Sequence, residues 1–198
     1  MSTNPITIVS GLPRSGTSMM MQVLEAGGIP ALKDDIRVAD EDNPKGYYEF
    51  ERVKQIAQDQ AWLEDAKGRV VKMVSALLLQ LPPTYTYKVI FMRRKIEEVL
   101  ASQKAMLGRK GEAPSPVGDD KMAALFRKHL DQVEKWVAGQ PNIEVLYVHY
   151  NEVLAEPRPQ MDQINRFLGG ALDVEKMVSV VDRTLYRQRD AQPRMEHK

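Results

Sequence analysis

Residues 9–18, VSGLPRSGTS, combine two glycines, an arginine and several hydroxyl groups in a way that suits anion binding. Gly11 and Gly16 can adopt positive φ angles, which lets consecutive backbone N–H groups curl around a phosphate. The stretch resembles the pattern G-x-x-x-x-G-K-[ST], but Thr17 stands where that pattern has lysine, and a cation lies within the loop as Arg14. We therefore expect a phosphate-like ligand, held differently from the triphosphate of an ATPase. The alternative is a glycine turn that only joins a strand to a helix.

The missing lysine also bears on metal binding. In nucleotide triphosphatases that lysine reaches the β- and γ-phosphates, the next hydroxyl binds magnesium, and an aspartate from another strand holds the metal. Here the apolar run KVIFM is followed by Arg93 and Arg94, which are cations where a carboxylate would be needed. The chain has no cysteine, and its three histidines have no metal-ligand spacing. The sequence therefore predicts an anion site without a metal, built from cations and backbone amides.

Apolar runs of strand length alternate along the chain with segments whose apolar residues recur at helical spacing. The predicted strands are 6–10, 69–73, 88–92 and 143–149, and the predicted helices are 18–26, 51–65, 96–107, 120–138 and 159–168. Loops are expected at 28–46, 81–87 and 108–118. This alternation indicates a mainly parallel sheet flanked by helices. We expect one three-layer α/β domain of the P-loop NTPase-like type over residues 1–198, in which the first helix directs its free N–H groups at the anion.

Charge and hydropathy exclude several other classes of protein. The formal net charge is +1 over 198 residues, which argues against a general binder of nucleic acid or of a membrane surface. Local basic stretches at 93–110 and 183–198 suit a small polyanion better than a polymer. The absence of cysteines, of a leader-like segment and of a long apolar run predicts a soluble cytoplasmic protein. The oligomeric state is not predicted.

Three stretches, in the right order, resemble the sulfotransferases that use 3′-phosphoadenosine 5′-phosphosulfate (PAPS). PRSGTS resembles their 5′-phosphosulfate loop, and an arginine within it is similar to the tyrosylprotein branch. KVIFMRRKIEEVLASQ resembles the 3′-phosphate motif, in which a serine follows an arginine by eight residues, as Ser102 follows Arg94. IEVLYVHYNEVLAEPRPQMDQINRFLG is similar to the family's strand, turn and helix ending in Phe-Leu-Gly.

The resemblance implies PAPS as donor, adenosine 3′,5′-bisphosphate (PAP) as product, no metal, and a small-molecule or peptide acceptor. It assigns donor binding to Pro13, Arg14, Ser15, Gly16, Thr17, Ser18, Arg94 and Ser102. The family's C-terminal Arg-Lys-Gly segment is missing, because Arg109-Lys110-Gly111 lies in the wrong part of the sequence. Arg187, with its neighbour Arg189, is the proposed substitute, and a frayed charged tail is the alternative. Met19 replaces the tryptophan that stacks on adenine, so the adenine partner is not predicted.

Sulfuryl transfer requires cations near the transferred group and a base for the acceptor proton. The resemblance assigns the cations to Arg14 and to Lys72, at the end of the second predicted strand. In the cytosolic branch the base is a histidine two residues after that lysine, but this chain has Val74 there. The resemblance to the heparan and tyrosylprotein branches allows a carboxylate in its place, and we expect Glu49 in NPKGYYEFE, a stretch similar to one in small bacterial sulfotransferases. The alternatives are Glu51 and Asp42, or a Glu49 that only stabilises the start of a helix.

Other residues and functions stay open at this point. His149 lies in a strand of buried character and is expected to be a core residue, not a base. Tyr47 and Tyr48 are walls of an acceptor pocket or simply pack within a loop. Two further functions are compatible with the motifs: a nucleotide or small-molecule kinase with a degenerate loop, and a non-catalytic protein that keeps the nucleotide pocket.

Overall fold

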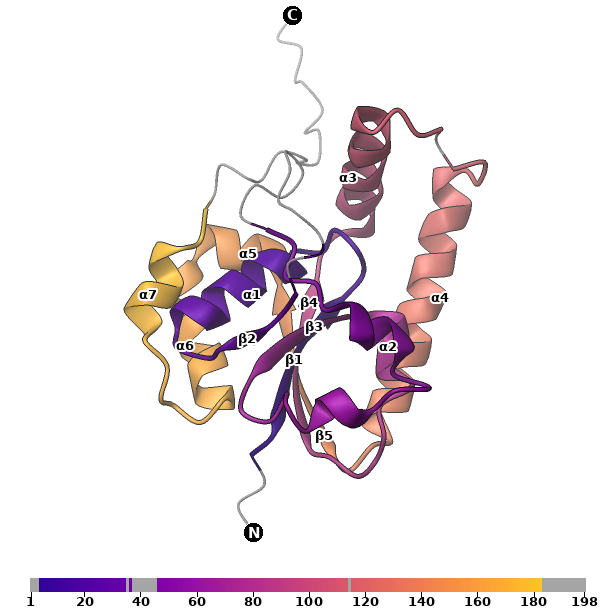
Figure 1. The fold of residues 1–198 in the computed structure, drawn as a ribbon. Helices are drawn as coiled ribbons and strands as arrows, with labels where there is room; N and C mark the ends of the chain where they lie inside the picture. The colour runs from indigo at the N-terminus through magenta and orange to yellow at the C-terminus, as the bar shows by residue number, and fades with distance from the viewer. Residues whose placement is uncertain (1–3, 35, 37–45, 114, 183–198) are drawn as a thin grey trace, which may run out of the picture.

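A computed structural model describes residues 4–34, 36, 46–113 and 115–182 (Figure 1). Five parallel strands form one sheet in the order β2-β3-β1-β4-β5. They are β1 (Ile6–Gly11), β2 (Ala31–Leu32), β3 (Val70–Val74), β4 (Tyr87–Arg93) and β5 (Ile143–His149). The four predicted strands are thereby confirmed, and β2 lies in a segment expected to be a loop.

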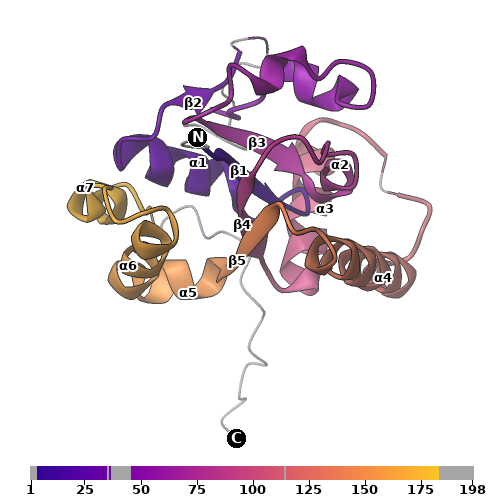
Figure 2. The same ribbon diagram turned by 90° about the horizontal axis from the view of Figure 1, so that it is seen from below.

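Helices cover both faces of this sheet (Figure 2). One face carries α1 (Thr17–Ala26), α5 (Tyr150–Ala155), α6 (Pro157–Phe167) and α7 (Val174–Ser179), and the other carries α2 (Ser75–Leu78) and α4 (Asp119–Ala138). Successive residues of a strand point to opposite faces, so Ile8 packs with the α2 and α4 side and Val9 with the α1 side. Two apolar cores result, one on each face. The predicted three-layer α/β architecture is confirmed.

The carboxyl ends of the strands meet at one edge of the sheet. In the strand register, Gly11 at the end of β1 is opposite Val74 of β3 and Met92 of β4. The next two strands in the chain, β2 and β3, lie on one side of β1 in the sheet, and β4 and β5 lie on its other side. Strand order therefore reverses at β1, and ligands of open α/β sheets bind at such a switch point. The glycine-rich loop begins there, and α3 (Ile96–Arg109) rises from this edge after β4 (Figure 1).

The segment 51–65 is not the single helix that its apolar spacing predicts. It forms two short 3₁₀ turns, η1 (Glu51–Gln55) and η2 (Ala61–Leu63). Asp59 lies between them, and its carboxylate accepts a hydrogen bond from the backbone N–H of Ala61 at 3.1 Å. A short polar side chain that bonds to nearby backbone competes with helix formation. The prediction of a long helix here was wrong, although the larger apolar side chains of this segment, Val53, Ile56, Trp62 and Leu63, are buried.

Other differences from the predicted elements concern short segments and one histidine. β2, α2, α5 and α7 have six residues or fewer, too few for a helical or strand period to be recognised. His149 is exposed at the end of β5, immediately before α5, and is not the core residue that was expected.

No helix among residues 4–34, 36, 46–113 and 115–182 is long and apolar enough to cross a lipid bilayer.

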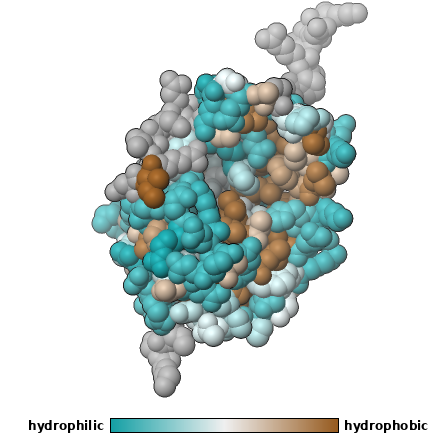
Figure 3. All heavy atoms as spheres, turned by 45° about the vertical axis from the view of Figure 1, so that its right-hand side comes forward, coloured by the Kyte–Doolittle hydropathy of each residue, from teal (hydrophilic) through white to brown (hydrophobic). Residues whose placement is uncertain are grey.

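Hydrophobic side chains reach the surface on the side where α2, α3 and α4 lie (Figure 3). Among the described residues, the large hydrophobic side chains that are exposed are those of Ile36, Val74, Leu79 and Leu125. Three of these four lie at the end of β3, at the end of α2 and on α4. The exposed apolar surface is thus concentrated near the carboxyl edge of the sheet and the two helices beside it.

Candidate active site

The loop between β1 and α1 has a backbone that depends on its glycines. Gly11 has a φ of 149°, and a Cβ atom there would lie 2.7 Å from the carbonyl oxygen of Met92. Gly16 has a φ of 99°, and a Cβ atom there would lie 2.4 Å from the ring of Tyr150. Arg14 also has a positive φ, 71°, which is uncommon for a residue other than glycine. The loop is therefore held in an unusual conformation by close contacts on two sides.

The start of α1 offers the anion-binding features expected of it. Its N-terminal cap is Gly16, which provides no side-chain hydrogen bond to the first turn. Thr17, Ser18 and Met19 of that turn line a pocket at the carboxyl edge of the sheet. The first N–H groups of a helix lack partners within the helix, and its dipole favours negative charge at this end. The loop and α1 together can hold a phosphate or sulfonate group.

The pocket has a volume of about 510 Å³ and gathers residues from five parts of the chain. Among the described residues, the positively charged side chains that line the pocket are those of Arg14, Lys72, Arg94, Arg109 and Lys110. The negatively charged side chain that lines it is that of Glu49. Cations in a concave site focus positive potential and attract anionic ligands. The excess of positive charge suits a ligand with several negative groups. Arg109 and Lys110, which seemed misplaced in the sequence, belong to this pocket because α3 runs along it.

The two motifs that resemble donor-binding segments meet at this pocket. Arg14 donates from Nε to Ser102 Oγ at 3.0 Å, although 88 positions separate them. Arg94 donates from a terminal guanidinium nitrogen to the backbone oxygen of Arg14 at 3.1 Å. The helix α3 therefore folds back over the end of β4 far enough to bring Ser102 to the loop. Arg94 and Ser102, predicted to converge, lie around the same residue, Arg14.

A buried carboxylate lies behind Arg94. Glu98, with its side chain 1% exposed, accepts from Arg94 Nε at 2.9 Å and from Asn151 Nδ2 at 3.0 Å. The guanidinium of Arg94 also lies over the ring of Tyr150, 4.5 Å from its centroid. Burial raises the pKa of the Tyr150 phenol above its ordinary value, and the charge of Arg94 opposes that rise. The phenol is therefore protonated at neutral pH, and Arg94 is fixed on three sides.

We expect Glu98→Ala to destabilise the fold by about 3–5 kcal/mol, because it leaves the buried charge of Arg94 without its carboxylate. Urea denaturation of the two proteins measures the difference. Glu97→Ala is the matched control, since Glu97 is 62% exposed and pairs with the equally exposed Arg127. Its removal is expected to change stability by less than about 1 kcal/mol. Equal losses in the two variants would contradict a special role of the buried pair.

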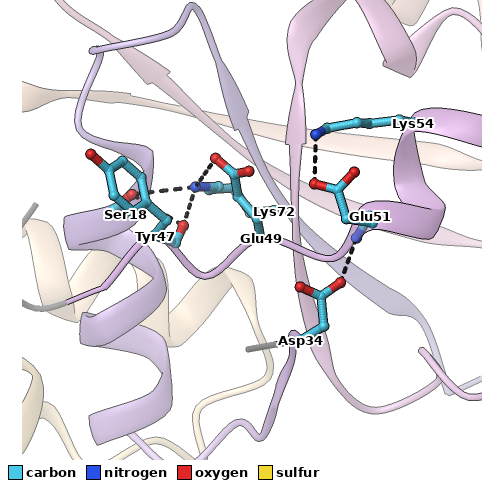
Figure 4. Close-up of polar contacts among 7 residues, drawn as sticks. All are labelled: Ser18, Asp34, Tyr47, Glu49, Glu51, Lys54 and Lys72. Atoms are coloured by element: carbon cyan, nitrogen blue, oxygen red, sulfur yellow. Dashed lines mark hydrogen bonds and ion pairs between the residues drawn. The ribbon is translucent and has the colours of Figure 1, made fainter. Parts of the chain in front are cut away.

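Lys72 and Glu49 face each other on the other side of the loop (Figure 4). Lys72 Nζ lies 3.9 Å from Glu49 Oε1, 3.4 Å from Ser18 Oγ, and donates to the backbone oxygen of Tyr47. Both charged side chains are largely buried, with 13% of Lys72 and 21% of Glu49 exposed. A cation, a carboxylate and the first turn of α1 thus share one corner of the pocket.

Glu51, one of the two alternative carboxylates, does not lie in this corner. Glu51 pairs with Lys54 at 2.6 Å, and its backbone N–H donates to Asp34 (Figure 4). Its side chain is not among those that line the pocket. The other alternative, Asp42, and both tail arginines, Arg187 and Arg189, lie outside the described residues.

Several other expected residues are placed by the structure. Tyr47 lines the pocket, whereas the Tyr48 hydroxyl donates to Glu25 at 2.7 Å and packs within the loop. Pro13 lines the pocket, but Ser15 does not, and the Ser15 hydroxyl is buried. The Ser15 hydroxyl has no hydrogen-bond partner among the described residues. Its assignment as a donor-binding residue stays a prediction without support from this geometry.

Some site residues had no signal in the sequence. Tyr150 begins α5, packs on Gly16 and lines the pocket, yet it is one of several tyrosines in apolar runs. Glu98 is one of two adjacent glutamates at the start of α3, and only the fold distinguishes the buried one. Arg93, next to Arg94, turns away from the pocket: it pairs with Glu134 on α4 and lies over a tyrosine ring.

Comparisons with known proteins agree with this fold. A family model described as a sulfotransferase domain matches residues 4–197. The sulfotransferase domain of a Synechococcus olefin synthase has a TM-score of 0.53 at 16% identity, covering 94% of this chain and 81% of that one. A sulfotransferase from Mycobacterium tuberculosis has a TM-score of 0.53 at 15% identity, with coverage of 90% and 71%. A sulfotransferase domain from the curacin biosynthetic pathway has a TM-score of 0.51 at 17% identity, with coverage of 90% and 79%. These structures share its fold, and no curated protein matches the chain significantly in sequence.

Proposed function

Because this chain belongs to the sulfotransferase family, we propose that it transfers a sulfuryl group from PAPS to a hydroxyl or amine acceptor. The observation that carries the proposal is the hydrogen bond from Arg14 to Ser102 at 3.0 Å. It joins the loop suited to a 5′-phosphosulfate with the helix suited to a 3′-phosphate. A ligand with negative groups at both ends would be held by two segments that are far apart in the sequence.

The residues of the pocket fit such a donor. A Cβ atom at Gly11 or Gly16 would clash with neighbouring atoms. Glycine at these positions therefore lets the loop pack closely on its neighbours while its N–H groups face a ligand. The cations Arg14, Lys72 and Arg94 line the same cavity. The donor supplies an activated sulfur, whose bond to the 5′-phosphate oxygen breaks as the bond to the acceptor oxygen or nitrogen forms.

The protein's own groups then have distinct tasks. Glu49 takes the proton from the acceptor, and Lys72, 3.9 Å away, holds that carboxylate and adds positive charge beside it. Arg14 and the N-terminus of α1 stabilise the negative charge that moves onto the leaving phosphate. Arg94 and Ser102 bind the 3′-phosphate, which does not change charge. The strand end where a magnesium site would need a carboxylate carries Arg94, which favours transfer without a metal.

Binding of PAP measured by thermal shift tests this function against its alternatives. Ligand at one hundred times its dissociation constant should stabilise the fold by about 2.7 kcal/mol. We expect this shift with PAP and none with Mg-ATP. A shift with Mg-ATP alone would indicate a kinase, and PAP binding without transfer to any acceptor would indicate a non-catalytic protein.

A further inference from the structure

Glu49 lies in residues 46–50, a segment without helix or strand, so regular secondary structure does not fix its position. Its contact with Lys72 is 3.9 Å, longer than a hydrogen bond, and does not fix it alone. We propose that Tyr48 and Asp34 are positioning residues, which hold the backbone around Glu49 so that its carboxylate stays beside Lys72. This inference rests on the proposed function, in which Glu49 takes the acceptor proton.

Tyr48 immediately precedes Glu49, so its backbone conformation sets the direction of that residue. Its φ of 54° is uncommon for a residue other than glycine and persists where surrounding contacts hold it. The Tyr48 hydroxyl donates to Glu25 Oε2 at 2.7 Å, and Lys33 Nζ lies 4.5 Å from the centroid of the Tyr48 ring. Lys33 also pairs with Glu25 at 3.3 Å. These contacts hold Tyr48 in its unusual conformation.

The partner of Tyr48 lies on the helix that also carries the anion-binding turn. Glu25 is near the end of α1, whereas Ser18, in the first turn, donates to the backbone oxygen of Tyr47 at 3.4 Å. Burial, and then the hydrogen bond to Glu25, raises the pKa of the Tyr48 phenol, so the phenol remains a hydrogen-bond donor at neutral pH. The two residues before Glu49 are therefore attached to the two ends of α1.

Asp34 holds the same segment from the side of the sheet. Its backbone N–H donates to the backbone oxygen of Glu49 at 2.8 Å, and its carboxylate accepts from the backbone N–H of Glu51 at 2.6 Å (Figure 4). The carboxylate also accepts from the N–H of Ile36 at 3.2 Å, which orients it. Asp34 closely follows β2, and β2 pairs with β3, the strand of Lys72. The backbone of Glu49 is thus connected to the strands that carry its partner.

Two substitutions that remove these contacts test the inference in the whole protein with PAPS as donor. Tyr48→Phe deletes the hydroxyl, and Asp34→Ala deletes the carboxylate. Each should lower kcat for para-nitrobenzyl alcohol by about ten- to a hundredfold, the effect of a misplaced catalytic group, with KM and PAP affinity nearly unchanged. Transfer to para-nitrophenolate, which is already ionised and needs no base, should fall by less than about twofold.

A second cluster of the same composition provides the matched control. The Tyr85 hydroxyl donates to Glu64 at 2.8 Å, Lys67 pairs with Glu64 at 2.7 Å, and none of the three lines the pocket. Tyr85→Phe therefore removes an equivalent hydrogen bond at a distance from Glu49 and should keep wild-type kcat. Wild-type kcat in Tyr48→Phe, or equal losses with the alcohol and the phenolate, would overturn the inference.

A conservative variant separates the hydrogen bond of Asp34 from its charge. Asp34→Asn should recover most of the turnover lost in Asp34→Ala, because an amide oxygen can still accept from the N–H of Glu51. No recovery in Asp34→Asn would contradict the role assigned to this hydrogen bond.

Hydrogen exchange followed by NMR gives a readout that needs no acceptor. The amide of Asp34, which donates to the Glu49 carbonyl, should exchange at least about fivefold faster in Tyr48→Phe, because loss of a hydrogen bond weakens local protection. It should exchange as in the wild type in Tyr85→Phe. Unchanged exchange in Tyr48→Phe would overturn the inference whether or not transfer is observed. A wild-type protein with neither a thermal shift with PAP nor sulfuryl transfer would instead contradict the proposed function itself.

Discussion

Replacing Arg14 by alanine is expected to lower turnover by about 10²–10³-fold, as the removal of one donor to a developing negative charge does in other enzymes. Arg14 lies in the glycine-rich loop, lines the pocket and is aligned by its hydrogen bond to Ser102. Its guanidinium is proposed to stabilise the leaving phosphate, whose negative charge grows in the transition state. The loss should therefore appear mainly in kcat, with a smaller loss of PAP affinity.

Steady-state kinetics and calorimetric titration of PAP measure these two effects separately. Arg93→Ala is the control for loss of a nearby cation, because Arg93 pairs with Glu134 and does not line the pocket. Its turnover should stay near that of the wild type. Wild-type turnover in Arg14→Ala would remove Arg14 from the mechanism. An equal loss in both variants would indicate a general effect of charge or stability.

That Arg94 and Ser102 serve one site could be predicted because KVIFMRRKIEEVLASQ resembles the family's 3′-phosphate motif. A residue at the end of a parallel strand and one two turns into the next helix face the same site only if that helix folds back. The glycine-rich loop after β1 supported this prediction, because that loop, like Arg94, follows the carboxyl end of a strand in a parallel sheet. The structure adds that Arg14 lies between the two residues and contacts both.

The roles of Glu98, Arg109 and Lys110 could not be predicted because they depend on packing between distant segments. Glu97 and Glu98 are identical in type and adjacent in sequence, but only Glu98 is buried and accepts a hydrogen bond from Asn151, 53 positions away. Arg109 and Lys110 resemble an ordinary basic helix end. They reach the pocket only because α3 runs along it.

The segment before β3 shows the limit of apolar spacing as a predictor. Its hydrophobic residues recur as in a helix, yet Asp59 bonds to local backbone and divides it into two 3₁₀ turns. Residues 46–50 form no helix or strand, and Tyr48 has a positive φ of 54°. That irregular backbone places Glu49 opposite Lys72 while the side chain of Glu51 points elsewhere.

Replacement of Glu49 by glutamine is expected to lower turnover by about 10²–10⁴-fold, the usual contribution of a general base. The substitution keeps the shape of the side chain and removes its ability to take a proton. PAP affinity should change little, since Glu49 is proposed to act on the acceptor. Glu51→Gln is the matched control and should have near wild-type turnover, because Glu51 pairs with Lys54 outside the pocket.

A further measurement separates a base from a residue that only holds Lys72. An acidic phenol that is already ionised needs no base, so the variant should turn it over at a rate much closer to that of the wild type. If Glu49 served only to position Lys72, 3.9 Å away, both acceptors would suffer equally. Near wild-type turnover of an unactivated alcohol by Glu49→Gln would remove Glu49 from the mechanism altogether.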